Sequence, residues 1–261
     1  MKRVFVVAAV LITMASTNVY AQRGGRGGRG DGQQGQRGAR TSAPADLTGY
    51  WVAVISEDWK FRMVTPPRGQ YGNVPMSAEG RRVADTWDPA KDEAAGAQCK
   101  AYGAAGVMRL PGRLHITWEN DNVMRIETDA GTQTRRFLFS GATPPSGDLG
   151  WQGQTAAEWQ SAGGRGTRFT EGEQSEAGGL MKAVTTKMRP GYLRKNGVPY
   201  GENAVMTEYF ERHLAPSGEQ YLVVTAVIED PQYLNGAYLT SANFKKLPNE
   251  QGWKPTPCSA R

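Results

Sequence analysis

Charged side chains that share a face with apolar neighbours are the first candidates for chemistry in this chain. In residues 204–213, period-two alternation places Glu208 and Arg212 on the same face as Met206 and Phe210. If this face points into a core, both charges must pair or meet a ligand, because an isolated buried charge is too costly. The pattern therefore predicts either a polar floor in a ligand cavity or a structural ion-pair layer.

A second segment, residues 122–128, places Arg125 and Glu127 on one face. Trp118, in predicted strand 113–118, and Tyr209, in predicted strand 204–213, can add aromatic surface. Together with Glu208 and Arg212, these residues are the predicted ligand-binding set, suited to a ligand that carries a carboxylate or a carbonyl group. The alternatives are an outer barrel face for the charges and ordinary core packing for the aromatic rings.

The elements that must position these side chains are predicted to be strands. Segments rich in β-branched and aromatic residues alternate with turn residues. They are residues 49–55, 60–64, 107–110, 113–118, 122–128, 132–139, 180–188, 204–213, 220–229 and 238–246. Turn sequences at 119–121, 129–131 and 216–218 join successive segments as hairpins. The pattern favours a mostly β fold, an antiparallel barrel or sandwich.

Residues 77–98 interrupt this pattern and predict two short helices. Ser77 can cap the first helix, whose first turn carries Glu79. Asp88 followed by Pro89 is the usual start of the second helix. We expect a helical insertion across one end of the sheet. A later stretch, residues 162–178, has no apolar pattern and is expected to be a loop, either idle or bordering a binding site.

Charge is concentrated at the start of the 261-residue chain, whose formal net charge is +6. Residues 1–21 have two basic residues, an apolar run and a small-x-small cleavage pattern, as in a signal peptide. Residues 22–45 are rich in Gly and Arg and are expected to be a disordered tail, either a spacer or a tether for an anionic polymer. The remaining residues, 46–261, are electrically balanced and are expected to form a single barrel domain. Periplasmic or secreted localisation follows, with no membrane span after signal removal.

Two cysteines occur, Cys99 and Cys258, both in the exported part. An oxidising compartment favours a disulfide between them, which would pin the proline-rich C-terminal end to the segment after the second helix. The alternative, a reactive thiol, needs a nearby base and a positive environment. No CxxC motif supports that alternative.

The first predicted strand resembles the opening of lipocalins and related calycin barrels. Residues 47–51 read Leu-Thr-Gly-Tyr-Trp, which contains the G-x-W pattern of that family. The resemblance implies a lipocalin-like barrel in which Trp51 plugs the closed end. It also implies that a late basic residue, Lys245 or Lys246, packs over the indole ring.

A looser likeness is to a group of exported bacterial proteins without assigned function. It implies a fold and a compartment and no activity. The matching pieces are Arg125-x-Glu127-x-Asp129, Trp151-x-Gly153, Val184-Thr185-Thr186, Thr207-Glu208-Tyr209-Phe210-x-Arg212 and Glu229-Asp230-Pro231-x-Tyr233.

Three function hypotheses remain open at this point. The first is an exported binding protein for a small apolar or amphipathic molecule. The second is a hydrolase or isomerase that uses Glu208 or Glu127 as a general base. The third is an envelope or matrix interaction protein that uses the Arg/Gly tail. No cofactor or metal site is predicted, since the motifs that would indicate one are missing and the two histidines, His115 and His213, have no ligand spacing.

Overall fold

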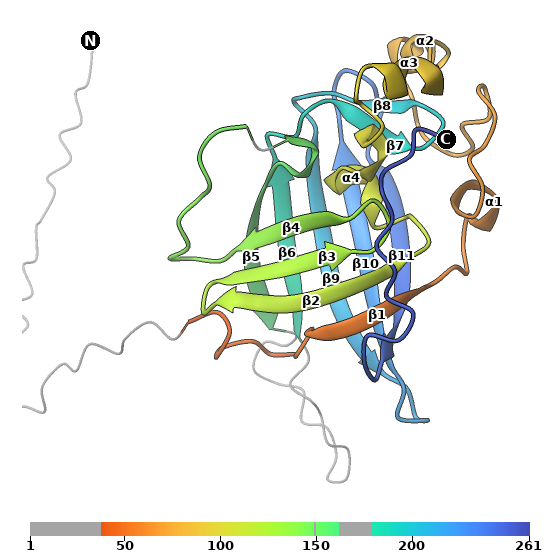
Figure 1. The fold of residues 1–261 in the computed structure, drawn as a ribbon. Coiled ribbons are helices and arrows are strands. Elements are labelled where there is room, and N and C mark those ends of the chain that lie inside the picture. The colour runs from red at the N-terminus through yellow and green to blue at the C-terminus, as the bar shows by residue number, and fades with distance from the viewer. Residues whose placement is uncertain (1–37, 149, 162–178) are drawn as a thin grey trace, which may run out of the picture. The chain divides into compact units, whose positions relative to one another are not determined.

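The computed structural model describes residues 38–148, 150–161 and 179–261. Within these residues, nine strands form the wall of a barrel. They are β1 (Gly49–Val54), β2 (Arg113–Asn120), β3 (Val123–Thr128), β4 (Gln133–Leu138), β5 (Gln154–Ser161), β6 (Gly179–Thr186), β9 (Val205–Leu214), β10 (Gln220–Glu229) and β11 (Tyr238–Leu247). The wall closes in the order β1-β11-β10-β9-β6-β5-β4-β3-β2 (Figure 1). The prediction of a mostly β barrel with a short helical insertion is confirmed.

Among the described strands of the wall, every pairing is antiparallel except that of β4 with β5. Eight of the ten predicted strand segments coincide with observed strands. The alternating patterns predict these strands correctly because each strand of a barrel has one face toward the core and one toward solvent.

Two predicted strands, residues 60–64 and 107–110, are wrong. The first overlaps the short helix α1 (Trp59–Arg62). The second begins at the last residue of the short helix α4 (Ala104–Val107) and continues into the turn that follows it. Their composition resembles that of a strand, but neither segment belongs to a sheet of the described structure. α4 packs closely instead, because a Cβ at Gly106 would lie 2.7 Å from the Ala101 carbonyl oxygen.

Three strands were not predicted: β5 and the strands β7 (Gly191–Arg194) and β8 (Val198–Tyr200) of a separate hairpin. β5 contains Gln, Ala and Glu, which have low strand propensity. Eight residue pairs with β6 hold it in the wall, so tertiary pairing overrides local preference.

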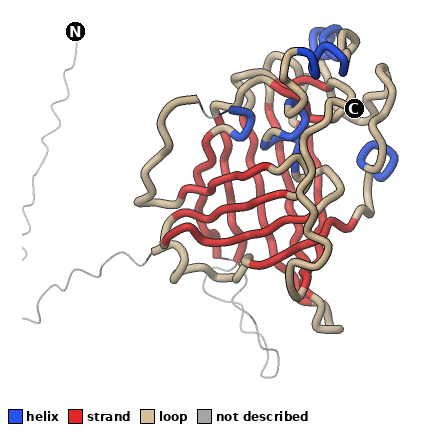
Figure 2. Tube along the Cα trace, in the orientation of Figure 1, coloured by secondary structure: helices blue, strands red, loops and turns tan. Residues whose placement is uncertain are grey.

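The predicted helical insertion is confirmed as α2 (Ala78–Ala84) and α3 (Pro89–Ala94). The Ser77 hydroxyl accepts a hydrogen bond from the Gly80 amide at 3.0 Å, and the Asp88 carboxylate accepts one from the Ala90 amide at 3.0 Å. Two 3-10 turns follow, η1 (Lys100–Tyr102) and η2 (Gly150–Gln152). Figure 2 shows the short helices gathered toward one end of the barrel, at the top of the view.

The contact expected from the lipocalin resemblance is present at the first strand. Trp51 is fully buried, donates its indole N–H to the Leu47 carbonyl at 3.0 Å, and has the Lys246 ammonium 5.3 Å from its ring centre. Up-and-down lipocalin barrels have eight strands, whereas the described part of this wall has nine and one parallel pairing. The likeness therefore consists of a closed barrel and this Trp–Lys contact.

The predicted disulfide between Cys99 and Cys258 is confirmed, with a Cα–Cα distance of 5.1 Å. Ahead of Cys258, Thr256 donates its amide to the Asp129 carbonyl at 2.8 Å, and Trp253 lies against the ring of Tyr50. The C-terminal segment therefore runs over the outer face of the first strands and is tied back to the helical end.

Residues 38–45, which composition placed in the tail, contact the barrel. The Ala39 amide donates to Asn122 at 3.0 Å, and the indole of Trp159 donates to the Ala39 carbonyl at 2.8 Å. We call residues 38–42 the strap. The predicted signal peptide, residues 22–37 of the predicted tail, and the predicted loop 162–178 lie outside the described residues.

Candidate functional site

The predicted pair Arg125 and Glu127 lies on the outer face of the barrel. Their side chains form an ion pair at 3.3 Å and keep about a third of their surface exposed. Glu127 also lies 3.2 Å from the His115 ring, which stacks on Tyr50 at 4.1 Å between ring centres. The face that carries these charges points away from the core, as in the alternative interpretation, and it forms an ion-pair layer beneath the C-terminal segment.

Glu208 points into the barrel and has no exposed surface. Its partner is Arg135, which donates to both carboxylate oxygens at 2.9 and 2.5 Å. Arg135 also donates to the Thr185 hydroxyl at 3.3 Å and lies over the Phe137 ring. In this bidentate pair each charge is balanced by its partner. Removing either residue would leave the other charge buried without compensation.

The other predicted residues are separated from this pair. Arg212 lies on the same side of β9 as Glu208, half-buried near the strand end, with Gln220 at 3.4 Å among its partners. Tyr209 is half-buried on the opposite side of β9. Trp118 packs against Phe139 at the other end of β2 from the helices. The structure therefore does not bring the six predicted ligand-binding residues into one site.

The described interior of the barrel is filled by side chains. Trp51, Ile116, Phe137, Phe210 and Phe244 are among the largest fully buried residues of one continuous apolar cluster. The cavity that reaches Glu208 has a volume of about 10 Å³, room for about one water molecule. The hollow interior that a deeply bound apolar ligand would require is not observed here.

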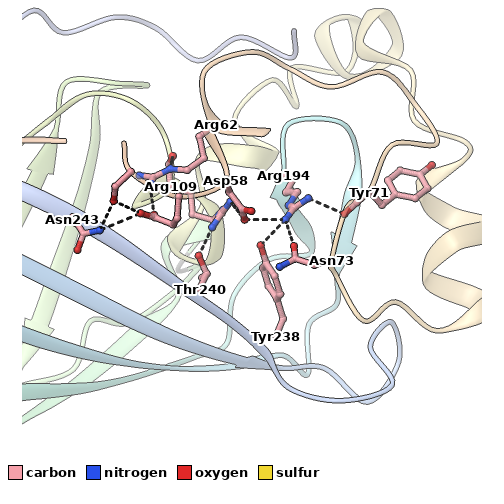
Figure 3. Close-up of polar contacts among 11 residues, drawn as sticks. Asp58, Arg62, Tyr71, Asn73, Arg109, Arg194, Tyr238, Thr240 and Asn243 are labelled. Carbon is pink, nitrogen blue, oxygen red and sulfur yellow. Dashed lines mark hydrogen bonds and ion pairs between the residues drawn. The ribbon is translucent and has the colours of Figure 1, made fainter. Parts of the chain in front are cut away.

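A different group of charges occupies the helical end of the barrel (Figure 3). We call it the mouth cluster: Arg62, Arg109, Arg194, Glu57 and Asp58. The side chains of the three arginines are 0, 7 and 1% exposed, respectively, although they come from three separate elements, α1, the turn after α4, and β7. Three arginines buried close together need hydrogen-bond partners for their N–H groups and negative charges to balance their own.

Asp58 is shared by two of these arginines. One oxygen, Oδ2, accepts from Arg109 at 3.0 Å and from Arg194 at 3.4 Å. Arg109 also donates to the Thr240 hydroxyl, and Arg62 donates to the Arg109 carbonyl at 2.8 Å. Asp58 therefore receives two guanidinium groups at once, through a single carboxylate oxygen.

The remaining contacts tie the cluster to its surroundings. Arg194 donates to the Tyr71 carbonyl at 2.8 Å, to Asn73 at 2.9 Å and to the Tyr238 hydroxyl at 3.1 Å. Arg62 pairs with Glu57, the second carboxylate of the cluster. These contacts hold the α1 segment and β7 against β11.

The mouth cluster has more positive than negative charge: three guanidinium groups face two carboxylates. Burial lowers the pKa of Arg62; the nearby Glu57 carboxylate opposes this shift, and the charge of Arg109 adds to it. Arginine nevertheless stays protonated in proteins. In addition, Arg62 Nη2 and Arg194 Nε have no hydrogen-bond partner among the described residues. The cluster therefore retains one uncompensated positive charge and free donors.

Arg109 separates two small cavities. One, of about 20 Å³, lies under the α1 segment and is lined by all three arginines together with Phe61, Leu193 and Lys195. The other is the 10 Å³ cavity in the barrel, which Arg109 also lines. The guanidinium thus stands at the boundary between the mouth and the interior.

The acidic partners sit on a segment that is less buried than the arginines. The side chains of Glu57 and Asp58 are 34 and 28% exposed. Asp58 adopts a left-handed backbone conformation, with φ 51°, which is uncommon for a residue other than glycine. The same segment leaves Trp59 67% exposed. It is therefore held at the mouth largely by its charges.

Sequence reasoning did not identify the three arginines. One local signal was available, since each directly follows a large apolar residue: Phe61, Met108 and Leu193. An arginine inside an apolar run is a candidate for burial, because the flanking side chains pack into the core. That signal does not show that the three segments meet.

No group of three or more His, Cys, Asp or Glu side chains within the described ranges is placed to hold a metal ion. Across those same ranges, no helix has the length and apolar character needed to cross a membrane. Comparison of the chain with protein-family models, with curated proteins and with solved structures found no match.

Proposed function

We propose that the protein binds a small anionic, amphipathic molecule at the mouth of the barrel. The observation that carries this proposal is the unequal charge of the mouth cluster, with three buried guanidinium groups against two part-exposed carboxylates. A carboxylate or phosphate from solution would balance that charge. Arginine suits the task because its planar fork donates two parallel hydrogen bonds to either group.

Asp58 occupies the place that such an anion would take. Its carboxylate lies between Arg109 and Arg194. A ligand with its own carboxylate would replace Asp58 and would need the α1 segment to move, since the present cavity holds about one water molecule. The apolar part of the ligand would then contact exposed side chains of that segment, such as Met63 and Val64.

Action outside the cytoplasm is part of the same proposal. It is supported by the predicted signal peptide in residues 1–21 and by the Cys99–Cys258 disulfide. Disulfides persist in oxidising compartments and are rare in the cytosol. Binding of an anionic polymer by the Arg/Gly tail is a separate proposal, and residues 22–37 of that tail lie outside the described residues.

The geometry favours binding over general-base catalysis by Glu208. Both of its carboxylate oxygens accept hydrogen bonds from Arg135, and no part of the residue is exposed. A general base must come within hydrogen-bond reach of a substrate proton. Glu208 would have to leave its partner and its burial to do so.

Calorimetric titration with three ligands of equal chain length tests the proposal: dodecanoate, dodecyl phosphate and dodecanol. The two anions should bind the wild-type protein at least about tenfold more tightly than dodecanol, since a hydrogen bond to a charged group contributes about 1.5–3 kcal/mol. Equal binding of dodecanoate and dodecanol would contradict the proposal, as would a lack of binding by all three.

Two arginine variants test whether anion binding depends on the mouth cluster or only on the total positive charge of the protein. Arg109→Met should lose the preference for the anions, because it removes the guanidinium at the boundary of both cavities. Arg136→Met is the matched control, since Arg136 is an exposed arginine paired with Glu119 on the outer face. An anion preference that persists in Arg109→Met, or an equal loss of it in both variants, would contradict binding at the mouth cluster.

A further inference from the structure

The wall of the barrel has an opening beside the pairing of β4 with β5. Only two residue pairs, Phe137 with Thr155 and Leu138 with Ala156, join these strands. β5 then continues for five more residues, 157–161, which pair with β6 on one side. On the other side, β4 ends and the chain turns away through Gly141, which has φ 87°. Within the described residues, the edge of β5 along this stretch has no strand partner.

The strap lies across this opening. Its Arg40 amide donates to the Asp121 carbonyl at 2.9 Å, and its Ala39 amide donates to Asn122, both in the turn between β2 and β3. On the opposite side, the Trp159 indole of β5 donates to the Ala39 carbonyl. The strap therefore bridges the two sides, and the space beneath it is enclosed by parts of four segments.

That space is a pocket of about 380 Å³, far larger than the cavities at the mouth. We call it the notch. It is lined by the strap, by Asn122, by the turn after β4 and by residues 157–159 of β5. Ser140, Gly141 and Glu158 are exposed, so the notch is open to solvent. A pocket of this size accepts a small ligand without any movement of the chain.

An aromatic stack forms one wall of the notch. The rings of Phe139 and Trp159 are stacked at 5.3 Å between centres, and Trp118 packs against Phe139 at 5.4 Å. Phe139 is buried and Trp159 is half-buried, so the indole presents the accessible ring surface. Its hydrogen bond to the strap fixes the orientation of that ring.

Polar groups stand around this aromatic surface. The Ser140 hydroxyl and the Asn122 Nδ2 make no hydrogen bond within the described residues, and Asn122 uses only its Oδ1, as an acceptor. Glu158 adds a carboxylate whose charge is met by Lys182 at 3.4 Å. The notch thus offers a ring face, neutral donors and acceptors and one carboxylate, and none of the described residues that line it is a cation.

We propose that the notch binds a neutral sugar ring. The C–H groups on one face of a pyranose carry partial positive charge and stack on the negative face of an indole. Hydroxyl groups at the ring edge both donate and accept, as Ser140, Asn122 and Glu158 require. A purely apolar ligand would leave these polar groups without partners, and an anionic ligand would meet Glu158. This proposal is independent of the mouth cluster.

Saturation-transfer NMR with a panel of hexoses, N-acetylhexosamines and their disaccharides tests the proposal on the purified protein. We expect transfer from the protein to the ring C–H protons of at least one sugar. Dodecanoate should not compete with that sugar, since it is proposed to bind at the other end of the barrel. No transfer to any member of the panel would overturn the proposal.

Variants locate the binding at the notch. Trp159→Leu should abolish the transfer, and Ser140→Ala should weaken binding by about two- to tenfold, the usual range for one neutral hydrogen bond. Trp59→Leu and Ser217→Ala, at exposed residues of the same types outside the notch, are the controls and should leave sugar binding unchanged. If Trp159→Leu fails to fold, Ser140→Ala decides the outcome, since its side chain is exposed. Unchanged affinity in the folded notch variants would overturn the proposal.

Discussion

Within the described residues, arginine is buried at two places, and the two places differ in how its charge is balanced. Inside the barrel, one guanidinium, Arg135, faces one carboxylate, Glu208, and both side chains are 1% exposed. At the mouth, three buried guanidinium groups face Glu57 and Asp58, which remain about one-third exposed. The first site is closed and neutral, whereas the second has excess positive charge and part-hydrated partners.

This difference separates a structural ion pair from a site that can exchange its anion. A fully buried pair cannot release one member without leaving the other uncompensated. A part-exposed carboxylate recovers its hydration when it leaves, so replacing it with another anion costs much less. We therefore expect the inner pair to respond to mutation through stability and the mouth cluster to respond through binding.

The largest effect is expected at the inner pair. Glu208→Gln leaves Arg135 buried without a counter-charge and should lower the free energy of unfolding by about 3–5 kcal/mol. Urea denaturation followed by circular dichroism measures this change. Glu158→Gln, which removes an exposed carboxylate from the pair with Lys182, is the control and should change stability by less than about 1 kcal/mol. Equal effects in the two variants would show that the buried Arg135–Glu208 pair contributes no more to stability than an exposed ion pair does.

Arg109→Met should have a smaller effect on the same measurement, about 1–2 kcal/mol, because the Asp58 carboxylate that it releases is part-exposed and keeps Arg194 as a partner. Binding of dodecanoate should fall much further than stability does. A loss of stability as large as that of Glu208→Gln would mean that the mouth cluster is structural, like the inner pair.

Asp58→Asn tests whether Asp58 competes with the ligand. Removing its charge should increase the affinity for dodecanoate about tenfold, while stability changes by about 1 kcal/mol or less. Calorimetric titration measures the first quantity and urea denaturation the second. Asp148→Asn, at an exposed acid paired with Arg189, is the matched control. Unchanged or weaker binding in Asp58→Asn would show that the carboxylate does not occupy the ligand position.

The remaining prediction concerns a buried polar group that has no charge at neutral pH and affects stability only in alkali. The Tyr200 hydroxyl is buried without a hydrogen-bond partner among the described residues, and burial raises its pKa. The folded state therefore favours the neutral phenol, and stability is lost as the pH rises above about 10, the ordinary tyrosine value. Near pH 11 this loss should be about 1.4 kcal/mol.

Tyr200→Phe should lack this contribution, so the variant should lose less stability than the wild type between neutral and alkaline pH. Denaturation curves at both pH values give the difference. Tyr221→Phe, at a half-buried tyrosine that donates to Glu219, serves as the control. If the wild type and Tyr200→Phe lose equal stability in alkali, the hydroxyl is solvated or paired in the folded protein.

Much of the fold follows from local patterns in the sequence. Alternation in residues 204–213 put Glu208 on one face with Met206 and Phe210 and left open whether that face points inward; in the structure it does, and Glu208 is buried against Arg135. The caps at Ser77 and Asp88 predicted both helices, because capping depends on a few neighbouring residues.

The mouth cluster could not be assembled in this way. Arg62 and Arg109 lie within residues 60–64 and 107–110, whose composition resembles that of strands but which are helical or form turns in the structure. Arg194 comes from β7, a short strand that pairs outside the barrel. Contacts between three such segments depend on long-range packing, which a local pattern does not encode. The notch could not be predicted from a local pattern either, because it results from the parallel pairing of β4 with β5, which ends after two residue pairs.

A crystal structure of the protein grown with dodecanoate tests the account most directly. We predict that the ligand carboxylate lies between Arg109 and Arg194 within hydrogen-bond distance of both, with Asp58 displaced from Arg109. The Arg135–Glu208 pair should be unchanged in the same crystal. Asp58 still bound to both arginines, with dodecanoate elsewhere on the protein or not bound at all, would contradict the account.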